Sequence, residues 1–186
     1  MYPITLDITR LKIVLAGDGS AAVRRLAGLD AAGAGDVVVF AERLDAALVE
    51  AAGSRLVRRL PTGQDLVGVS LLLVAGLEEA AAAPLVAMAR ALGVLVNVED
   101  RKPWCDFHVP SIVRRGDLQI AISTSGRSPG LARRLRRFLE SLFVPGWASH
   151  LDELAARREQ WRAEGADPAA VSRLTDDLID RRGWLR

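Results

Sequence analysis

Short apolar runs alternate, along the first hundred positions, with longer segments in which apolar residues recur at helical spacing. Apolar runs of about 4 to 8 residues that end at glycine or at a polar residue are typical of strands buried on both faces. Strands are expected at 11–16, 36–41, 55–57, 70–75 and 94–98, and helices at 17–32, 44–52 and 79–92. Such alternation predicts the α/β class, with a Rossmann-like doubly wound parallel sheet whose ligands bind at the carboxyl ends of the strands.

The pattern changes after residue 100, where the alternation of strands and helices stops. Pro103 and Pro110 interrupt residues 101–115, which are therefore expected to form a loop. Ser128 followed by Pro129 is typical of a helix start, because serine caps the first turn and proline fits its first position. The other expected elements are a half-exposed strand at 117–123, a helix that begins at 129 and ends before 144, and a helical tail with helices at about 148–163 and 167–182.

The cysteine count, the net charge and the length of the apolar runs exclude several classes of protein. Cys105 is the only cysteine and the net charge is +2, so neither a disulfide framework nor a nucleic-acid-binding surface is expected. The first residues lack the basic and apolar regions of a signal peptide, and the longest apolar runs are shorter than the roughly 20 residues of a membrane helix. The protein is therefore expected to be cytoplasmic, with no membrane partner. The two histidines, His108 and His150, are far apart in sequence, and no metal site is expected.

The sharpest signal is a glycine-rich turn at residues 17–22, with the pattern G-x-G-x-x-A, which directly follows the first expected strand. In a dinucleotide-binding turn, Gly17 would permit the tight turn, Gly19 would let the backbone approach a pyrophosphate, and Ala22 would allow close packing of the helix. The amino terminus of that helix stabilises the phosphate charge. Because strand, turn, helix and second strand occur in the required order, the turn is interpreted as a dinucleotide site rather than as packing alone.

Two acidic residues lie where the carboxyl edge of the sheet is expected. Glu42 ends the second strand and is a candidate for the hydroxyls of the adenosine ribose, although Arg43 beside it leaves only a mild preference for NAD over NADP. Asp100 follows the strand that ends at Val98, so it should lie where the nicotinamide and the substrate meet. Its carboxylate is a candidate general base, and capping of the turn before Pro103 is the equally open alternative.

A hydroxyl-rich segment, Ser123 to Ser128, precedes the helix that begins at Pro129. Its hydroxyls, its backbone N–H groups and the Arg127 guanidinium could bind an anion at a helix amino terminus. Ordinary helix capping explains the same residues equally well. Arginine clusters at 114–115 and 133–137 also suit carboxylate or phosphate ligands, with a solvated helix face as the alternative for the second cluster.

Three stretches together resemble the precorrin-2 dehydrogenase family, whose members also form the first half of multifunctional siroheme synthases. They are the opening Pro3–Asp7, the turn region Val14–Ala34 and, most specifically, Val94–Leu142, which contains VLVNVED and CDFHVPSIVRRGDLQIAISTSGRSPGLARRLRRFLE. The resemblance implies NAD as the cofactor and oxidation of precorrin-2 to sirohydrochlorin in siroheme biosynthesis, with Asp100 as the catalytic residue. It also implies insertion of Fe²⁺, a lyase activity, as a step that family members often add, and a homodimer whose carboxyl-terminal helices complete the site.

Position and resemblance together assign residues to the parts of the site. The expected cofactor-binding residues are Gly17, Asp18, Gly19, Ser20, Ala21, Glu42, Ala75 and Gly76, and the expected substrate-binding residues are Arg114, Ser123, Thr124, Ser125, Gly126, Arg127 and Ser128. The implied domains are an NAD-binding Rossmann domain at 1–100, a substrate-loop and dimerisation region at 101–145 and a helical domain at 146–186. A non-catalytic protein of the same fold that senses NAD or carries a tetrapyrrole is the alternative that the residues leave open.

Overall fold

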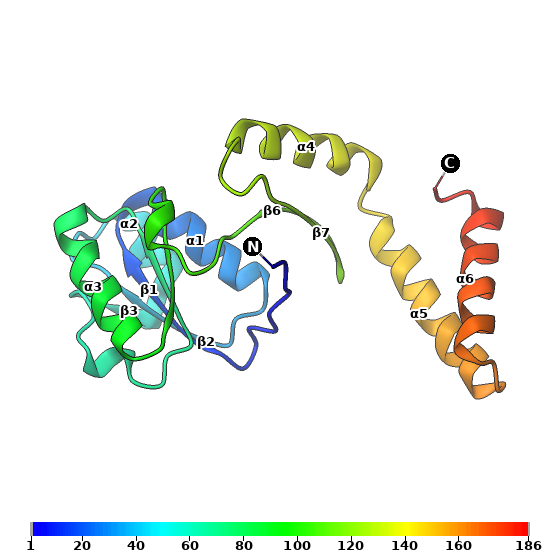
Figure 1. Ribbon diagram of the computed structural model, residues 1–186, viewed down its shortest axis with the longest axis horizontal. Helices are drawn as coiled ribbons and strands as arrows, with labels where there is room; N and C mark the ends of the chain where they lie inside the picture. Colours follow the sequence, from blue (N-terminus) through cyan, green and yellow to red (C-terminus); the bar gives the residue numbers. More distant parts are fainter. Residues whose placement is uncertain (1, 186) are drawn as a thin grey trace. The chain divides into compact units, whose positions relative to one another are not determined.

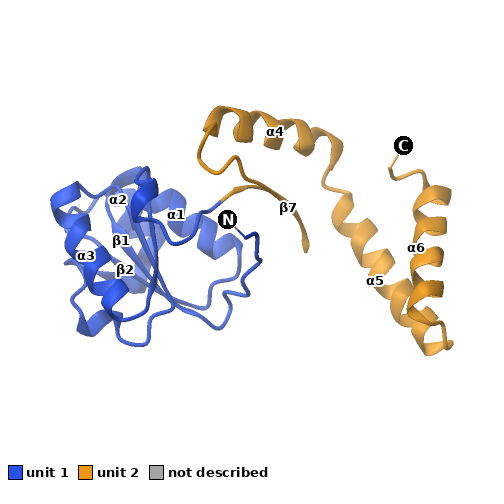
Figure 2. Cartoon of the chain, in the orientation of Figure 1, with its two compact units in different colours: residues 1–109 blue, residues 110–186 orange. Residues whose placement is uncertain are grey.

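The computed structural model describes residues 2–185 (Figure 1). The chain forms two compact units, residues 1–109 and residues 110–186 (Figure 2). The first unit contains a parallel sheet with helices, and the second contains a strand pair and helices. No helix within the described range is long and apolar enough to cross a membrane. The three-domain division expected from the sequence stays a prediction.

Five parallel strands form the sheet of the first unit, in the order β3-β2-β1-β4-β5. The strands are β1 (Lys12–Gly17), β2 (Asp36–Phe40), β3 (Leu56–Val57), β4 (Leu71–Ala75) and β5 (Leu95–Val98), and the helices are α1 (Gly19–Ala31), α2 (Ala46–Ala52) and α3 (Glu79–Ala91). Short 3₁₀ turns lie at Gly53–Arg55, Gln64–Leu66 and Lys102–Trp104. The strand order changes direction between β1 and β4, which is the switch point where open α/β sheets bind ligands. The predicted fold class is confirmed.

Side chains from both faces of the sheet build the core of the first unit, with helices on both sides (Figure 1). On β1, Ile13 and Leu15 pack in one cluster with α1 and α2, whereas Val14 and Ala16 pack in another with α3. Successive side chains of a strand point to opposite faces, so a continuous apolar run fills both clusters. This packing fixes the carboxyl ends of β1 and β4, where the glycine turn begins.

The second unit contains, within its described residues, an antiparallel hairpin and three helices. They are β6 (Ser111–Arg115), β7 (Leu118–Ile122), α4 (Pro129–Leu142), α5 (Trp147–Ala163) and α6 (Pro168–Arg182). Strand β6 corrects the expectation of a loop over 101–115, because residues 111–115 pair with β7 through a two-residue turn at Gly116 and Asp117. Gly116 has a φ of +58°, which suits such hairpin turns. The run SIVRR has too few apolar residues to indicate a strand without its partner.

An aromatic cluster lies near the ends of the helices in the second unit. The His150 ring of α5 stacks on Trp184, which follows α6, with ring centroids 4.2 Å apart. Trp147 meets His150 edge-on at 5.2 Å and Phe143 at 5.0 Å. Trp147 and Trp184 are therefore packing anchors, and they join the start of α5 to the end of α6.

The cap of α6 gives a first testable prediction. Asp167 Oδ1 accepts a hydrogen bond from the Ala170 N–H at 2.7 Å. Asp167→Ala is expected to lower the free energy of unfolding by about 1 kcal/mol, because an amide of the first turn loses its partner. Urea denaturation followed by circular dichroism measures the change. Asp176→Ala, at an exposed position of the same helix, is the control and should change stability by less than about 0.5 kcal/mol; equal losses would contradict the capping role.

Candidate dinucleotide site and substrate loop

The glycine turn brings the ends of β1 and β4 into close contact. A side chain at Gly17 would collide with the Ala75 carbonyl oxygen, and the Asp18 N–H donates to that same oxygen at 3.1 Å. Gly76, with a φ of +71°, could not carry a side chain either, because the Asp18 carbonyl oxygen occupies that space. Gly17 is therefore needed for close approach of the two strand ends. The left-handed residue that the turn requires is Gly19, with a φ of +63°.

The Asp18 carboxylate does not cap α1, although Asp18 is the residue that precedes its first turn. Its Oδ1 accepts from the Arg43 backbone N–H at 3.1 Å, and its Oδ2 accepts from Arg43 Nε at 3.3 Å. The Asp18 side chain is only 8% exposed, whereas that of Arg43 is 73% exposed. The first amides of α1 consequently have no side-chain partner.

A cleft of about 380 Å³ opens beside these uncapped amides. It is lined by Asp18, Gly19, Arg43, Leu44, Asp45 and Gly76. Free N–H groups and the positive end of a helix dipole bind phosphate groups. The residues present therefore fit a dinucleotide pyrophosphate. Glu42, the predicted ribose-binding residue, is exposed but is not one of the lining residues, whereas its neighbour Arg43 is.

Asp100 follows β5 at the carboxyl edge of the sheet, as predicted. Its backbone has a φ of +60°, which is uncommon for a residue other than glycine and is often associated with functional sites. The neighbouring Glu99 N–H donates to the Val74 carbonyl oxygen at 2.9 Å, which ties this turn to β4. The Asp100 carboxylate is exposed and accepts no hydrogen bond from any residue that the structure describes. The turn-capping alternative therefore finds no support in the geometry.

Two arginines of α1 approach this edge, and neither was among the predicted site residues. Arg24 donates to Ser20 Oγ at 3.0 Å and to Glu99 Oε1 at 3.5 Å, so it links the glycine turn to the end of β5. Burial lowers the pKa of Arg25, and the negative charge of Glu99 opposes that shift. The spacing of four residues from Ser20 to Arg24 is the signal that could have pointed to the first of them.

The structure places the predicted substrate-binding hydroxyls in one loop before α4, where those of Ser123, Thr124 and Ser128 bond to backbone groups of the loop or of the first turn of α4. Ser123 Oγ accepts from the Ser125 N–H at 3.2 Å, and Thr124 Oγ1 accepts from the Ser128 N–H at 3.3 Å. Ser128 Oγ accepts from the Leu131 N–H at 3.3 Å and so caps α4. Ser125 has a φ of +52°, so this loop holds a second unusual backbone conformation. Ser128 therefore caps α4, and Ser123 and Thr124 hold the loop; the role of these residues in binding the substrate stays a prediction.

The three predicted arginines nearest this loop differ in what they contact. Arg115 donates to the carbonyl oxygens of Phe143 and Glu140 at 2.5 and 3.2 Å, so it holds the end of α4. Neither Arg114 nor Arg127 has a side-chain hydrogen bond or ion pair with a residue in the described range. Arg114 is half-buried on β6 and Arg127 is exposed in the loop. Of these three arginines, Arg114 and Arg127 therefore have the guanidinium groups that are available for an anionic ligand.

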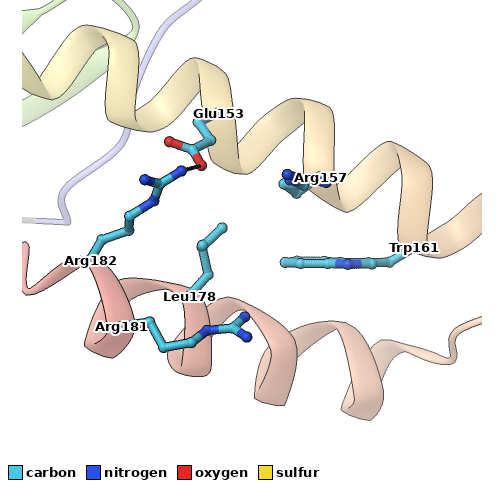
Figure 3. Close-up of a pocket in the computed structure, with 6 residues that line it drawn as sticks. All are labelled: Glu153, Arg157, Trp161, Leu178, Arg181 and Arg182. Carbon is cyan, nitrogen blue, oxygen red and sulfur yellow. Dashed lines mark hydrogen bonds and ion pairs between the residues drawn. The ribbon is translucent and has the colours of Figure 1, made fainter.

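An open groove of about 490 Å³ runs between α5 and α6 (Figure 3). It is lined by Glu153, Arg157, Trp161, Leu178, Arg181 and Arg182. Arg182 Nη2 donates to Glu153 Oε1 at 2.5 Å across the groove. Arg157 bonds to Gln160 at 3.1 Å on its own helix, and Arg181 Nε donates to the Asp177 carbonyl oxygen at 3.1 Å. None of the predicted site residues lines this groove.

A doubly wound parallel sheet, a glycine turn at its switch point and an uncapped helix beside a cleft define a dinucleotide-binding Rossmann protein. Comparison with known families agrees. The family described as "Putative NAD(P)-binding" matches residues 4–111, and the family described as "Sirohaem biosynthesis protein central" matches residues 115–142. The chain belongs to this NAD(P)-binding family, which confirms the predicted type of cofactor.

Individual relatives extend the similarity over nearly the whole chain. Siroheme synthases of Methylococcus capsulatus and Neisseria meningitidis serogroup C are 37% and 33% identical to it, over 90% and 98% of its length. The chain spans 36% and 37% of those two proteins. The solved structure of SirC, a precorrin-2 dehydrogenase, matches with a TM-score of 0.79 at 25% identity, covering 100% of this chain and 92% of SirC. These similarities confirm the resemblance inferred from the sequence.

Proposed function

We propose that the protein oxidises precorrin-2 to sirohydrochlorin and uses NAD as the hydride acceptor. The observation that carries the proposal is the likeness to SirC over the full length of the chain. That match includes the glycine turn, the end of β5 and the loop before α4. A likeness confined to the sheet would indicate only a dinucleotide-binding domain, whereas this one extends to the segment proposed to bind the substrate.

The proposed cofactor contacts follow from the turn. NAD, when bound, supplies the acceptor for the hydride that leaves the substrate. The amides of Gly19, Ser20 and Ala21 would hold the pyrophosphate, and Ala75 with Gly76 would flank the nicotinamide end. Glu42 remains the proposed contact for the ribose hydroxyls, and its side chain would have to turn toward the cleft to reach them.

Asp100 is proposed to take the proton. Oxidation of the substrate removes a hydride and a proton, so a base is needed in addition to the hydride acceptor. The Asp100 carboxylate is free of hydrogen bonds within the described range and lies at the edge where nicotinamide binds in this class of sheet. The left-handed backbone conformation of Asp100 sets the direction in which its side chain projects from the turn.

The proposed substrate contacts and partner belong to the second unit. Precorrin-2 carries many carboxylates, and the free guanidinium groups of Arg114 and Arg127 suit them. A homodimer is proposed because apolar side chains of α4 are exposed at helical spacing. They are Leu131 (50% exposed), Leu135 (37%), Phe138 (58%) and Leu142 (54%). A face of this kind is typical of a surface that pairs with another protein copy.

Iron insertion into the product is a further step of the same proposal, with Fe²⁺ as a substrate. The described residues contain no group of three or more His, Cys, Asp or Glu side chains placed to hold a metal. Asp100 and the bound tetrapyrrole are the proposed contacts of the ion.

Anaerobic incubation of the purified protein with enzymatically generated precorrin-2 and NAD tests the proposal. We expect NADH and sirohydrochlorin to appear together, in equal amounts, and neither to form without NAD. A parallel reaction with NADP measures the cofactor preference, and later addition of Fe²⁺ tests for siroheme. Binding of NAD and tetrapyrrole without NADH formation would refute the dehydrogenase and would favour a protein that senses or carries these ligands.

A further inference from the structure

Asp18 places a carboxylate inside the turn that would receive a pyrophosphate. Its side chain is more than nine-tenths buried and forms part of the cleft wall with Gly19 and Gly76. A buried carboxylate repels phosphate groups that lie only a few ångströms away, because little water screens them. An uncompensated Asp18 could also cap α1, and its oxygens would then occupy the amides that a phosphate needs.

Arg43 contacts both oxygens of this carboxylate. Its backbone N–H donates to Oδ1 at 3.1 Å and its Nε donates to Oδ2 at 3.3 Å. The Asp18 carboxylate is therefore held by the segment between β2 and α2, and α1 has no side-chain cap. Since Arg43 also lines the cleft, its positive charge lies next to the negative charge that it compensates.

We propose that Arg43 is a positioning residue for the dinucleotide, because it neutralises Asp18 and holds that carboxylate away from the amino terminus of α1. This inference rests on the proposed binding of NAD at the same turn. It leads to a conditional effect: the Arg43 side chain matters for NAD affinity only while residue 18 is an acid. A direct contact between Arg43 and the cofactor would not depend on residue 18.

A double-mutant cycle measures that dependence. Isothermal titration calorimetry with NAD is carried out on wild type, Arg43→Ala, Asp18→Ala and the double variant, each in its unliganded form. Arg43→Ala is expected to raise the Kd by about tenfold, through the uncompensated charge. Asp18→Ala, which removes both the charge and the oxygen that could cap α1, should bind at least as tightly as wild type. The double variant should bind within about threefold of wild type.

Two other results would distinguish a failure of this inference from a failure of the proposed function. A double variant as weak as Arg43→Ala would overturn the inference, because Arg43 would then act on the cofactor without Asp18. Wild-type protein that does not bind NAD would instead refute the proposed function, whatever the variants do. Thermal unfolding of all four proteins without NAD checks that each is folded, and Arg43→Gln replaces Arg43→Ala in the cycle if that variant is not.

Discussion

Asp100→Asn is expected to lower the kcat of precorrin-2 oxidation by about 10²- to 10⁴-fold, while the Kd for NAD stays unchanged. An amide cannot accept the proton that the carboxylate takes. Asparagine is the sharpest replacement because residue 100 has a φ of +60°, a conformation that asparagine adopts more readily than alanine does. Steady-state NADH formation measures kcat, and calorimetry with NAD measures binding.

Glu99→Gln is the matched control for this experiment. Glu99 adjoins Asp100 and pairs with Arg24 at 3.5 Å. Glu99→Gln therefore also removes one carboxylate charge, at the position next to Asp100. We expect its kcat to fall by less than about fivefold, since a partly exposed ion pair contributes little. Equal losses in the two variants would mean that the site needs negative charge at this edge rather than a base at Asp100.

The sequence predicted the first unit well because the signals there are local. Each strand of the sheet is a short apolar run, and the glycine turn lies between β1 and α1 with the spacing that a dinucleotide site needs. The cap of α4 at Ser128 was also predictable, since serine followed by proline marks a helix start wherever it occurs.

Features that depend on distant partners were not predictable in the same way. Strand β6 exists because β7 pairs with it, and its own five residues carry no strand periodicity. The partner of Asp18 is Arg43, which lies 25 positions later and comes close only when β2 pairs with β1. Gly17 was expected to permit a tight turn, and the structure adds a second reason for glycine, which is its close approach to Ala75. Ala75 belongs to β4, which pairs with β1 but is distant from it in the sequence.

That close approach leads to the prediction with the largest expected effect on stability. Gly17→Ala should lower the free energy of unfolding by about 3 kcal/mol, because the added methyl group meets the Ala75 carbonyl oxygen, a backbone atom that cannot move without shifting β4. Any displacement of β4 also moves Gly76, which follows β4 and lines the cleft, so NAD affinity should fall by more than about tenfold. Urea denaturation and calorimetry measure the two effects.

Gly28→Ala is the control, since it adds the same methyl group to the same structural unit. Gly28 lies within α1, and a side chain there would meet no atom within 4 Å. Alanine is the better helix former, so this variant should be more stable than wild type by about 0.5–1 kcal/mol and should bind NAD normally. If Gly17→Ala proved as stable as Gly28→Ala, neither the contact between β1 and β4 nor the turn itself would require glycine at position 17, and the argument from close approach would be wrong.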